Sequence, residues 1–162
     1  MPVYTKILRA DFPLERVDLD RLIRDILSSY PDFHPAKANV AVKGTLPGVV
    51  GNEAWLTQCL SNLLSNAVKF MPPGVIAVVK VSAEFLNGHV RIWIEDNGIG
   101  IDSKDKDRVF RLFEKIHHRS EYEGTGIGLT IARKAIERMN GRIGFESELG
   151  KGSRFWIELK KA

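Results

Sequence analysis

The sequence predicts one α+β domain, in which a mostly antiparallel mixed sheet carries three main helices on one face. Two observations lead to this fold class. Apolar residues recur at helical spacing in three segments, and the segments between them alternate in polarity or contain hairpin turns. The chain has 162 residues and 44% hydrophobic content, which is enough for one core of ordinary size. We expect this domain to span residues 11–162, with residues 1–10 as the tail of a preceding helical domain or a linker.

Caps and breakers set the expected limits of the helices. The three helices are expected from the N-cap Asp18 to Pro31, from near Asn52 to about Phe70, and from the glycines near Gly124 to Asn140-Gly141. The second helix is ended by Pro72-Pro73-Gly74. Its predicted core stripe consists of Leu56, Cys59, Leu60, Leu63, Leu64 and Ala67.

Strands are predicted between the helices. Their expected ranges are 38–43, 75–85, 89–95, 142–147 and 154–159. Asn87-Gly88 joins the second and third of these in a hairpin, because both residues tolerate positive φ. Residues 103–113 suggest a short helix, and residues 117–123 suggest a polar loop.

Composition excludes several classes of function. The net charge is +4, but the basic residues are spread over many segments, which favours a solvated surface over a nucleic-acid interface. No apolar run approaches the length of a membrane span, so we expect no membrane contact by this segment. Cys59 is the only cysteine, and a buried thiol in a reducing cytoplasm is the expected state.

A polar stripe accompanies the apolar one on the second helix. Asn62, Asn66 and Lys69 are spaced i, i+4 and i+7, so they lie on one face. Amide oxygens can serve as ligands for Mg²⁺, and a lysine one turn on can neutralise phosphate oxygens. The alternative is an ordinary solvated helix face, and the stripe alone does not decide between them.

Two glycine-containing turns are further candidates for a nucleotide site. A predicted strand delivers Asp96 into the turn of residues 96–101 (DNGIGI), where the carboxylate could accept a hydrogen bond from the amine of adenine; guanine would present an acceptor instead. The alternative is a plain Asp-Asn-Gly turn. Residues 124–129 (GTGIGL) open the third helix, where exposed backbone N–H groups suit a triphosphate. Neither the dinucleotide-binding spacing nor a P-loop is present, and residues 150–153 (GKGS) are interpreted as a turn between strands.

Together, in this order, five segments resemble the N, G1, F, G2 and G3 boxes of the ATP-binding catalytic domain of sensor histidine kinases in two-component systems. They are residues 62–70 (NLLSNAVKF), 96–100 (DNGIG), 109–113 (VFRLF), 124–129 (GTGIGL) and 150–153 (GKGS). The resemblance implies a Bergerat-type two-layer α/β sandwich that binds ATP between its second and third helices. Residues 1–10 would then be the tail of the dimerisation and phosphoacceptor domain.

The resemblance also implies roles for individual residues. Asn66 would coordinate Mg²⁺ with support from Asn62, Lys69 would reach phosphate, and Asp96 would read the adenine amine. The other residues implied in ATP binding are Phe70, Gly98, Gly100, Ile101, Gly124, Thr125, Gly126, Ile127, Gly128, Leu129 and Ser153. Residues 114–123 would form a lid over the nucleotide. Phe110 and Phe113 would pack at its root or serve the core, and His118 and Arg119 could approach phosphate or remain solvated.

The sequence departs from relatives of this fold in two ways that matter for function. None of the four histidines has the context of the family's phosphorylated histidine, so the acceptor is expected on a separate dimerisation domain of a homodimeric parent, for relay to a response regulator. In the chaperone, DNA-repair and topoisomerase ATPases and the anti-sigma-factor serine kinases, a glutamate general base occupies the place of Asn62, and an amide cannot take that proton. A conformational ATPase or serine kinase is therefore the second hypothesis, and a non-catalytic ATP-sensing module the third.

Overall fold

In the computed structural model, the described residues are 13–35, 37–102 and 126–162; for residues 126–131 the backbone alone is described. The described chain contains the helices α2 (Leu19–Ser29), α3 (Glu53–Lys69) and α4 (Gly126–Arg138) and the short 3-10 helix η1 (Pro31–Phe33). Its strands are β1 (Glu15–Asp18), β2 (Ala38–Val42), β3 (Gly48–Gly51), β4 (Ala77–Leu86), β5 (His89–Asp96), β6 (Arg142–Ser147) and β7 (Ser153–Lys160). The expected short helix at 103–113, the loop at 117–123, the lid and residues 1–10 lie outside the described residues.

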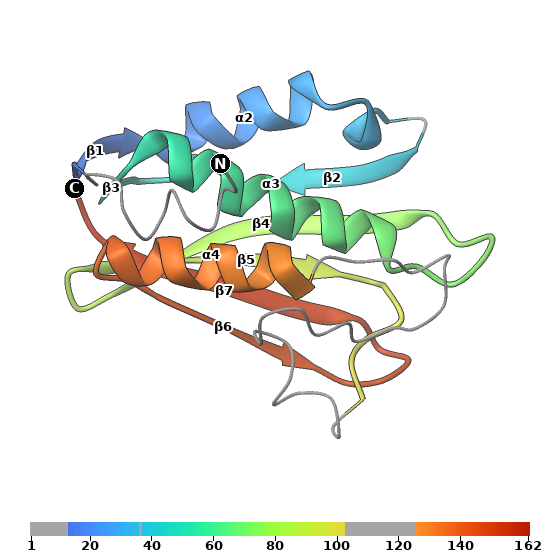
Figure 1. The fold of residues 1–162 in the computed structure, drawn as a ribbon. Coiled ribbons are helices and arrows are strands. Elements are labelled where there is room, and N and C mark those ends of the chain that lie inside the picture. The colour runs from blue at the N-terminus through green and yellow to red at the C-terminus, as the bar shows by residue number, and fades with distance from the viewer. Residues whose placement is uncertain (1–12, 36, 103–125) are drawn as a thin grey trace.

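The main sheet has five strands in the order β2-β4-β5-β7-β6. β2 pairs with β4 in parallel, and all other pairs are antiparallel. The three helices cover one face of this sheet (Figure 1), as predicted for a two-layer sandwich. Asn87 and Gly88, with φ of 45° and 80°, form the expected hairpin turn between β4 and β5.

The helices begin and end where local chemistry predicts. The side chain of Asp18 accepts a hydrogen bond from Arg21 N at 3.2 Å, and α2 stops at Ser29, before Pro31. Asn52 caps α3 in the same way, accepting from Trp55 N at 3.1 Å, and Lys69 lies in its last turn. Asn140, in the left-handed region with φ of 62°, follows α4.

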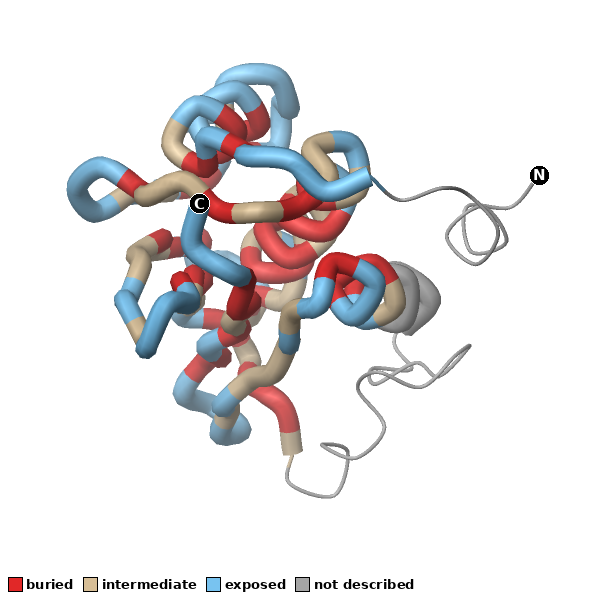
Figure 2. Tube along the Cα trace, turned by 90° about the vertical axis from the view of Figure 1, so that its left-hand side faces the viewer, coloured by how far each residue is buried: buried red, intermediate tan, exposed pale blue. Residues whose placement is uncertain are grey.

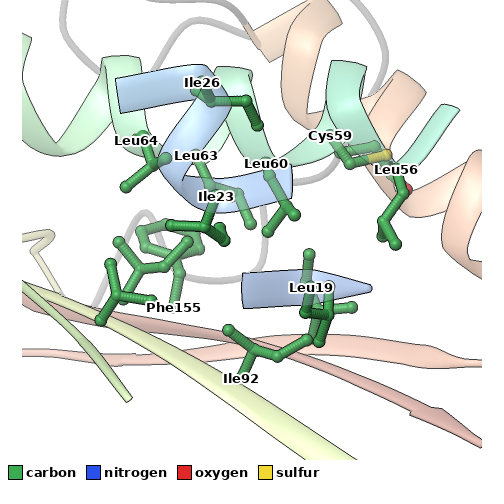
Figure 3. Close-up of a cluster of buried hydrophobic side chains, with 14 of the residues drawn as sticks. Leu19, Ile23, Ile26, Leu56, Cys59, Leu60, Leu63, Leu64, Ile92 and Phe155 are labelled. Carbon is green, nitrogen blue, oxygen red and sulfur yellow. Dashed lines mark hydrogen bonds between the residues drawn. The ribbon is translucent and has the colours of Figure 1, made fainter. Parts of the chain in front are cut away.

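The core lies between the helix layer and the sheet. Figure 2 shows that the buried parts of the chain gather there, and Figure 3 shows side chains of α2 and α3 packed toward Ile92 of β5 and Phe155 of β7. The predicted core stripe of α3 is confirmed, because all of its members are buried: Leu56, Cys59, Leu60, Leu63, Leu64 and Ala67. Burial raises the pKa of the Cys59 thiol to about 12, which keeps it protonated and unreactive.

One prediction about the strands needs correction, and one pair of strands was missed. The strand expected to start at Val75 begins at Ala77, because Val75 N donates to Pro72 O at 3.2 Å and closes a turn after the helix. The two-stranded sheet of β1 and β3 was not predicted at all. Each of its strands has only four residues, which is too short for alternation to stand out. No helix in the described part of the chain is long and apolar enough to cross a bilayer.

Candidate functional site

The candidate residues gather at one end of the sandwich. α3 and β5 both end there, the turn between β6 and β7 lies beside them, and α4 begins on the same side (Figure 1). The last turns of α3 carry Asn66 and Lys69, and β5 delivers Asp96 as its last residue. The topology therefore brings together segments that are up to 90 residues apart in the sequence, as Asn62 and Gly152 are.

Asn66 decides between the two interpretations of the polar stripe on α3. Its side chain is buried, with 7% exposure, whereas a residue on a solvated face would be exposed. Its Nδ2 atom is buried and has no hydrogen-bond partner among the described residues. A buried amide without a partner costs about 1–3 kcal/mol, which a hydrogen-bond acceptor on a ligand would offset. Asn62 is half-buried one turn earlier, and Lys69 is exposed one turn later.

The carboxylate of Asp96 has two oxygens with different surroundings. Oδ1 accepts hydrogen bonds from Gly98 N at 2.8 Å and from Ser153 N at 3.2 Å. The plain Asp-Asn-Gly turn considered for this segment is thus present, and Oδ1 stabilises it by accepting these hydrogen bonds. Oδ2 takes part in no hydrogen bond within the described residues, so it remains available to an outside donor.

Burial raises the pKa of Asp96 to about 6, although the hydrogen bonds from Gly98 N and Ser153 N lower it. Desolvation therefore outweighs the two N–H donors. The carboxylate is charged at neutral pH, but burial disfavours the charged form. A hydrogen-bond donor on a ligand would stabilise that charge. Strongly perturbed carboxylates in proteins cluster at functional sites.

The turn after β5 is held by backbone hydrogen bonds on two sides. Ile99 N donates to Phe70 O, the carbonyl at the end of α3, at 2.9 Å. Gly150 N, in the turn between β6 and β7, donates to Ile99 O at 2.7 Å. Backbone hydrogen bonds thereby join the segments that resemble the N, G1 and G3 boxes.

Two glycines in this turn are needed because protein backbone approaches them closely. A Cβ on Gly98 would collide with Phe70 O, and a Cβ on Gly100, which has a φ of 75°, would collide with Glu148 O. These two glycines are therefore required by close contacts within the chain itself.

The remaining predicted residues divide into two groups. Phe70 is half-buried at the end of α3, and Ile101 (5% exposed) and Ser153 (7% exposed) are buried beside the turn. Gly124 and Thr125 lie outside the described residues, and Gly126, Ile127, Gly128 and Leu129 form the first turn of α4.

Two residues that shape the site were not predicted. The amide of Asn97 extends the sheet, since Val78 N donates to Oδ1 at 2.8 Å and Nδ2 donates to Ile76 O at 3.2 Å. Ser147, the last residue of β6, accepts from Ile101 N at 2.8 Å. No periodicity marks either residue; for Asn97, its place next to Asp96 in a turn was the only available signal.

Comparison with known proteins identifies the family. Residues 51–162 match the model of the histidine kinase-, DNA gyrase B-, and HSP90-like ATPases, which is more than half of the chain. The chain belongs to this family. The chain spans only 12 to 15% of the length of the two relatives described next.

The chain is 41% identical over 114 residues to cyanobacterial phytochrome A of a Nostoc species, covering 70% of this chain and 15% of that protein. It is 39% identical over 118 residues to the sensor histidine kinase AruS of Pseudomonas aeruginosa, covering 69% of this chain and 12% of that one. Among solved structures, full-length ShkA in complex with AMPPNP is similar, with a TM-score of 0.79 and 30% identity over 99% of this chain and 34% of that one. The chain is therefore a histidine kinase-type ATPase domain with the sandwich fold of histidine kinase catalytic domains.

The contact at Gly100 predicts a difference between two glycine variants. Gly100→Ala and Gly150→Ala both place a side chain at positive φ, 75° and 84° respectively, but no atom lies within 4 Å of the Cβ position at Gly150. We expect Gly150→Ala to lower the free energy of unfolding by about 1–2 kcal/mol, from backbone strain alone. Gly100→Ala should lose about 1–3 kcal/mol more, because Glu148 O must move. Urea denaturation measures both, and equal losses would contradict the close packing at Gly100.

The raised pKa of Asp96 predicts how stability depends on pH. A carboxyl group with a higher pKa in the folded chain binds protons preferentially there, so its contribution is full below about pH 4 and is lost as pH rises through about 6. Relative to Asp96→Asn, the wild type should therefore lose about 1–3 kcal/mol of unfolding free energy between pH 4 and pH 7. Denaturation curves of both proteins at the two pH values measure this. If the difference in unfolding free energy between the two proteins is the same at both pH values, the pKa of Asp96 is not raised in the folded chain.

Proposed function

We propose that this domain binds Mg²⁺ and ATP at the end of the sandwich and provides the catalytic half of a sensor histidine kinase. The observation that carries the proposal is Asp96, a half-buried carboxylate with one oxygen engaged by the turn and the other left for an outside donor. The amine of adenine supplies such a donor, whereas guanine presents an acceptor oxygen at that position. Family membership supports the proposal, as does the AMPPNP complex of the similar kinase ShkA.

The residues of α3 fit the phosphate side of this ligand. The oxygen of the Asn66 amide would hold Mg²⁺ with support from Asn62, and its unpartnered Nδ2 could donate to a phosphate oxygen. Lys69, exposed at the end of the helix, would neutralise phosphate charge. When bound, Mg²⁺ would supply further neutralisation of the phosphate oxygens. The first turn of α4, with Gly126, Ile127, Gly128 and Leu129, would offer backbone N–H groups to the phosphates.

The remaining implied residues would complete the nucleotide site. Phe70, Gly98, Gly100, Ile101 and Ser153 would surround the base, and Gly124 and Thr125 would belong to the hinge of the lid.

The acceptor would be a histidine on a separate dimerisation domain of the parent protein, for relay to the receiver domain of a response regulator. Residues 1–10 would be the tail of that dimerisation domain, and 11–162 the catalytic domain. Transfer to a neutral imidazole depends on positioning and electrostatics more than on a resident base. We therefore expect this domain to be almost inactive alone, as a monomeric cytoplasmic unit of a parent that is a homodimer.

The second candidate is a conformational ATPase or a serine kinase of the anti-sigma-factor type. These enzymes need a general base one turn before the Mg²⁺-binding asparagine, and this chain has Asn62 there. An amide cannot accept the proton of an attacking water or hydroxyl. The side chain present therefore favours the histidine kinase.

Removing the charge of Asp96 should weaken ATP binding. We expect Asp96→Asn to raise the Kd for Mg·ATP about tenfold or more, because the amide replaces a charged acceptor with a weaker one or with a donor. The matched control is Glu95→Gln: Glu95 lies next in the sequence, but its side chain pairs with Lys80 and Arg154 away from the turn. Its Kd should change less than about twofold. Calorimetric titration measures both, and an unchanged Kd in Asp96→Asn would remove the adenine assignment.

Asn66 should be essential for phosphoryl transfer. Mixed with the parent's dimerisation domain and γ-labelled ATP, the wild-type chain should label a histidine, giving an acid-labile phosphate, while releasing almost no free phosphate alone. Asn66→Ala should lower the labelling rate by about 10²-fold, through lost phosphate positioning. The control is Ser65→Ala, a half-buried neighbour on the same helix, which should leave the rate unchanged. Acid-stable labelling of serine, or rapid hydrolysis by the chain alone, would favour the second candidate.

A further inference from the structure

Three polar side chains lie across three adjacent strands at the site. Asp96 ends β5 and is paired with Ser153, the first residue of β7, which in turn is paired with Ser147 at the end of β6. Directly paired residues of antiparallel strands project from the same face of the sheet. Ser153 shares that face with the core residue Phe155, so all three side chains project toward the helix layer.

The hydroxyl of Ser147 has three hydrogen-bonding neighbours, and only one arrangement of its hydrogen and lone pairs bonds to all three. Ile101 N, at 2.8 Å, can only donate, and Gly152 O, at 3.0 Å, can only accept. A serine hydroxyl has one hydrogen and two lone pairs. With its hydrogen on Gly152 O and one lone pair on Ile101 N–H, Ser147 can meet the hydroxyl of Ser153, 2.7 Å away, only as an acceptor.

The opposite arrangement makes fewer hydrogen bonds. If Ser147 donated to Ser153 instead, Gly152 O would keep only the longer bond from Glu148 N, at 3.4 Å. The hydrogen of Ser153 would then have no acceptor among the described residues. Buried polar groups in proteins are almost always paired, so the first arrangement is favoured.

The hydroxyl of Ser153 therefore donates its only hydrogen to Oγ of Ser147. Its lone pairs accept no hydrogen bond within the described chain, and Ser153, which is 7% exposed, is directly paired with Asp96 on the neighbouring strand. Two paired residues of adjacent strands thus each carry an oxygen that can accept a hydrogen bond from a ligand, Oδ2 of Asp96 and Oγ of Ser153. A primary amine carries two hydrogens and is complementary to such a pair.

We propose that Ser147 is a positioning residue for base selection, which holds the hydroxyl of Ser153 as an acceptor so that Asp96 and Ser153 together receive both hydrogens of the exocyclic amine. This inference rests on the proposed ATP site and adds to it a residue outside all five resembling segments. Ser147 touches no nucleotide; it acts by fixing the direction of one hydrogen.

The test compares ATP with purine riboside triphosphate, in which hydrogen replaces the amine. The Kd for purine riboside triphosphate divided by the Kd for ATP reports what the amine contributes to binding. We expect this ratio to fall about fivefold in Ser153→Ala, which removes one acceptor, and about as much in Ser147→Ala, which frees Ser153 to turn its hydrogen outward. Ser147→Thr keeps the hydroxyl and should restore the ratio. Ser82→Ala, a half-buried serine of β4 in the same sheet, is the control.

A purely structural role for Ser147 gives a different result. Loss of the Ile101 contact alone would weaken both nucleotides equally and leave the ratio unchanged, which would overturn the proposal. The double variant Ser147→Ala with Ser153→Ala should match Ser153→Ala alone, because Ser147 acts only through Ser153. A further fall in the ratio would also overturn it. If Ser147→Ala does not fold, Ser147→Cys replaces it, since a thiol is a poor hydrogen-bonding group of similar shape.

Failure of the proposed function looks different again. A wild-type chain that binds no ATP would overturn both the function and this inference. A wild-type chain that binds ATP, with an amine contribution unaffected by Ser153→Ala, would overturn this inference alone.

Discussion

The site depends on the position of one short turn between two parts of the fold. Phe70 O at the end of α3 receives Ile99 N, and Ile99 O receives Gly150 N from the turn between β6 and β7. These bonds are made by backbone atoms, so they set distances without dictating side chains. Asp96 lies immediately before this turn, so the turn helps to fix its position. The position of the Asp96 carboxylate therefore depends on the packing of α3 on the sheet and on the pairing of β5 with β7.

Much of this arrangement follows from local sequence. The helices were predictable because their caps and their apolar stripes agree, as at Asn52 and along Leu56 to Ala67. The hairpin at Asn87-Gly88 was predictable from turn chemistry. Asp96 and Asn66 became candidates because a strand end and a helix face place them where a ligand could meet them. In each of these cases the determining contacts lie within a few residues in the chain.

The parts that sequence reasoning missed are set by contacts between distant segments. β1 and β3 are four residues each and exist because Glu15–Asp18 pairs with residues that lie 30 to 36 positions away in the sequence. The close contacts of Gly98 and Gly100 with Phe70 O and Glu148 O could not be predicted, because they depend on the tertiary fold. Ser147 is 46 residues from Ile101, and neither position signals the other. Burial of Asn66 likewise could be known only once the helix layer was placed.

The register of β7 has a consequence for how this domain can change over evolution. Ser153 shares its face with Phe155, Ile157 and Leu159, which are buried in the core. Because side chains alternate along a strand, inserting or deleting one residue within β7 would turn either the serine or the hydrophobic residues to the wrong side. A change in the length of this strand therefore disrupts either the packing of the core or the hydrogen bond between Ser153 and Ser147. The turn between β6 and β7 is constrained as well, because Gly150 N donates to Ile99 O and a Cβ on Gly152 would collide with Asp96 O.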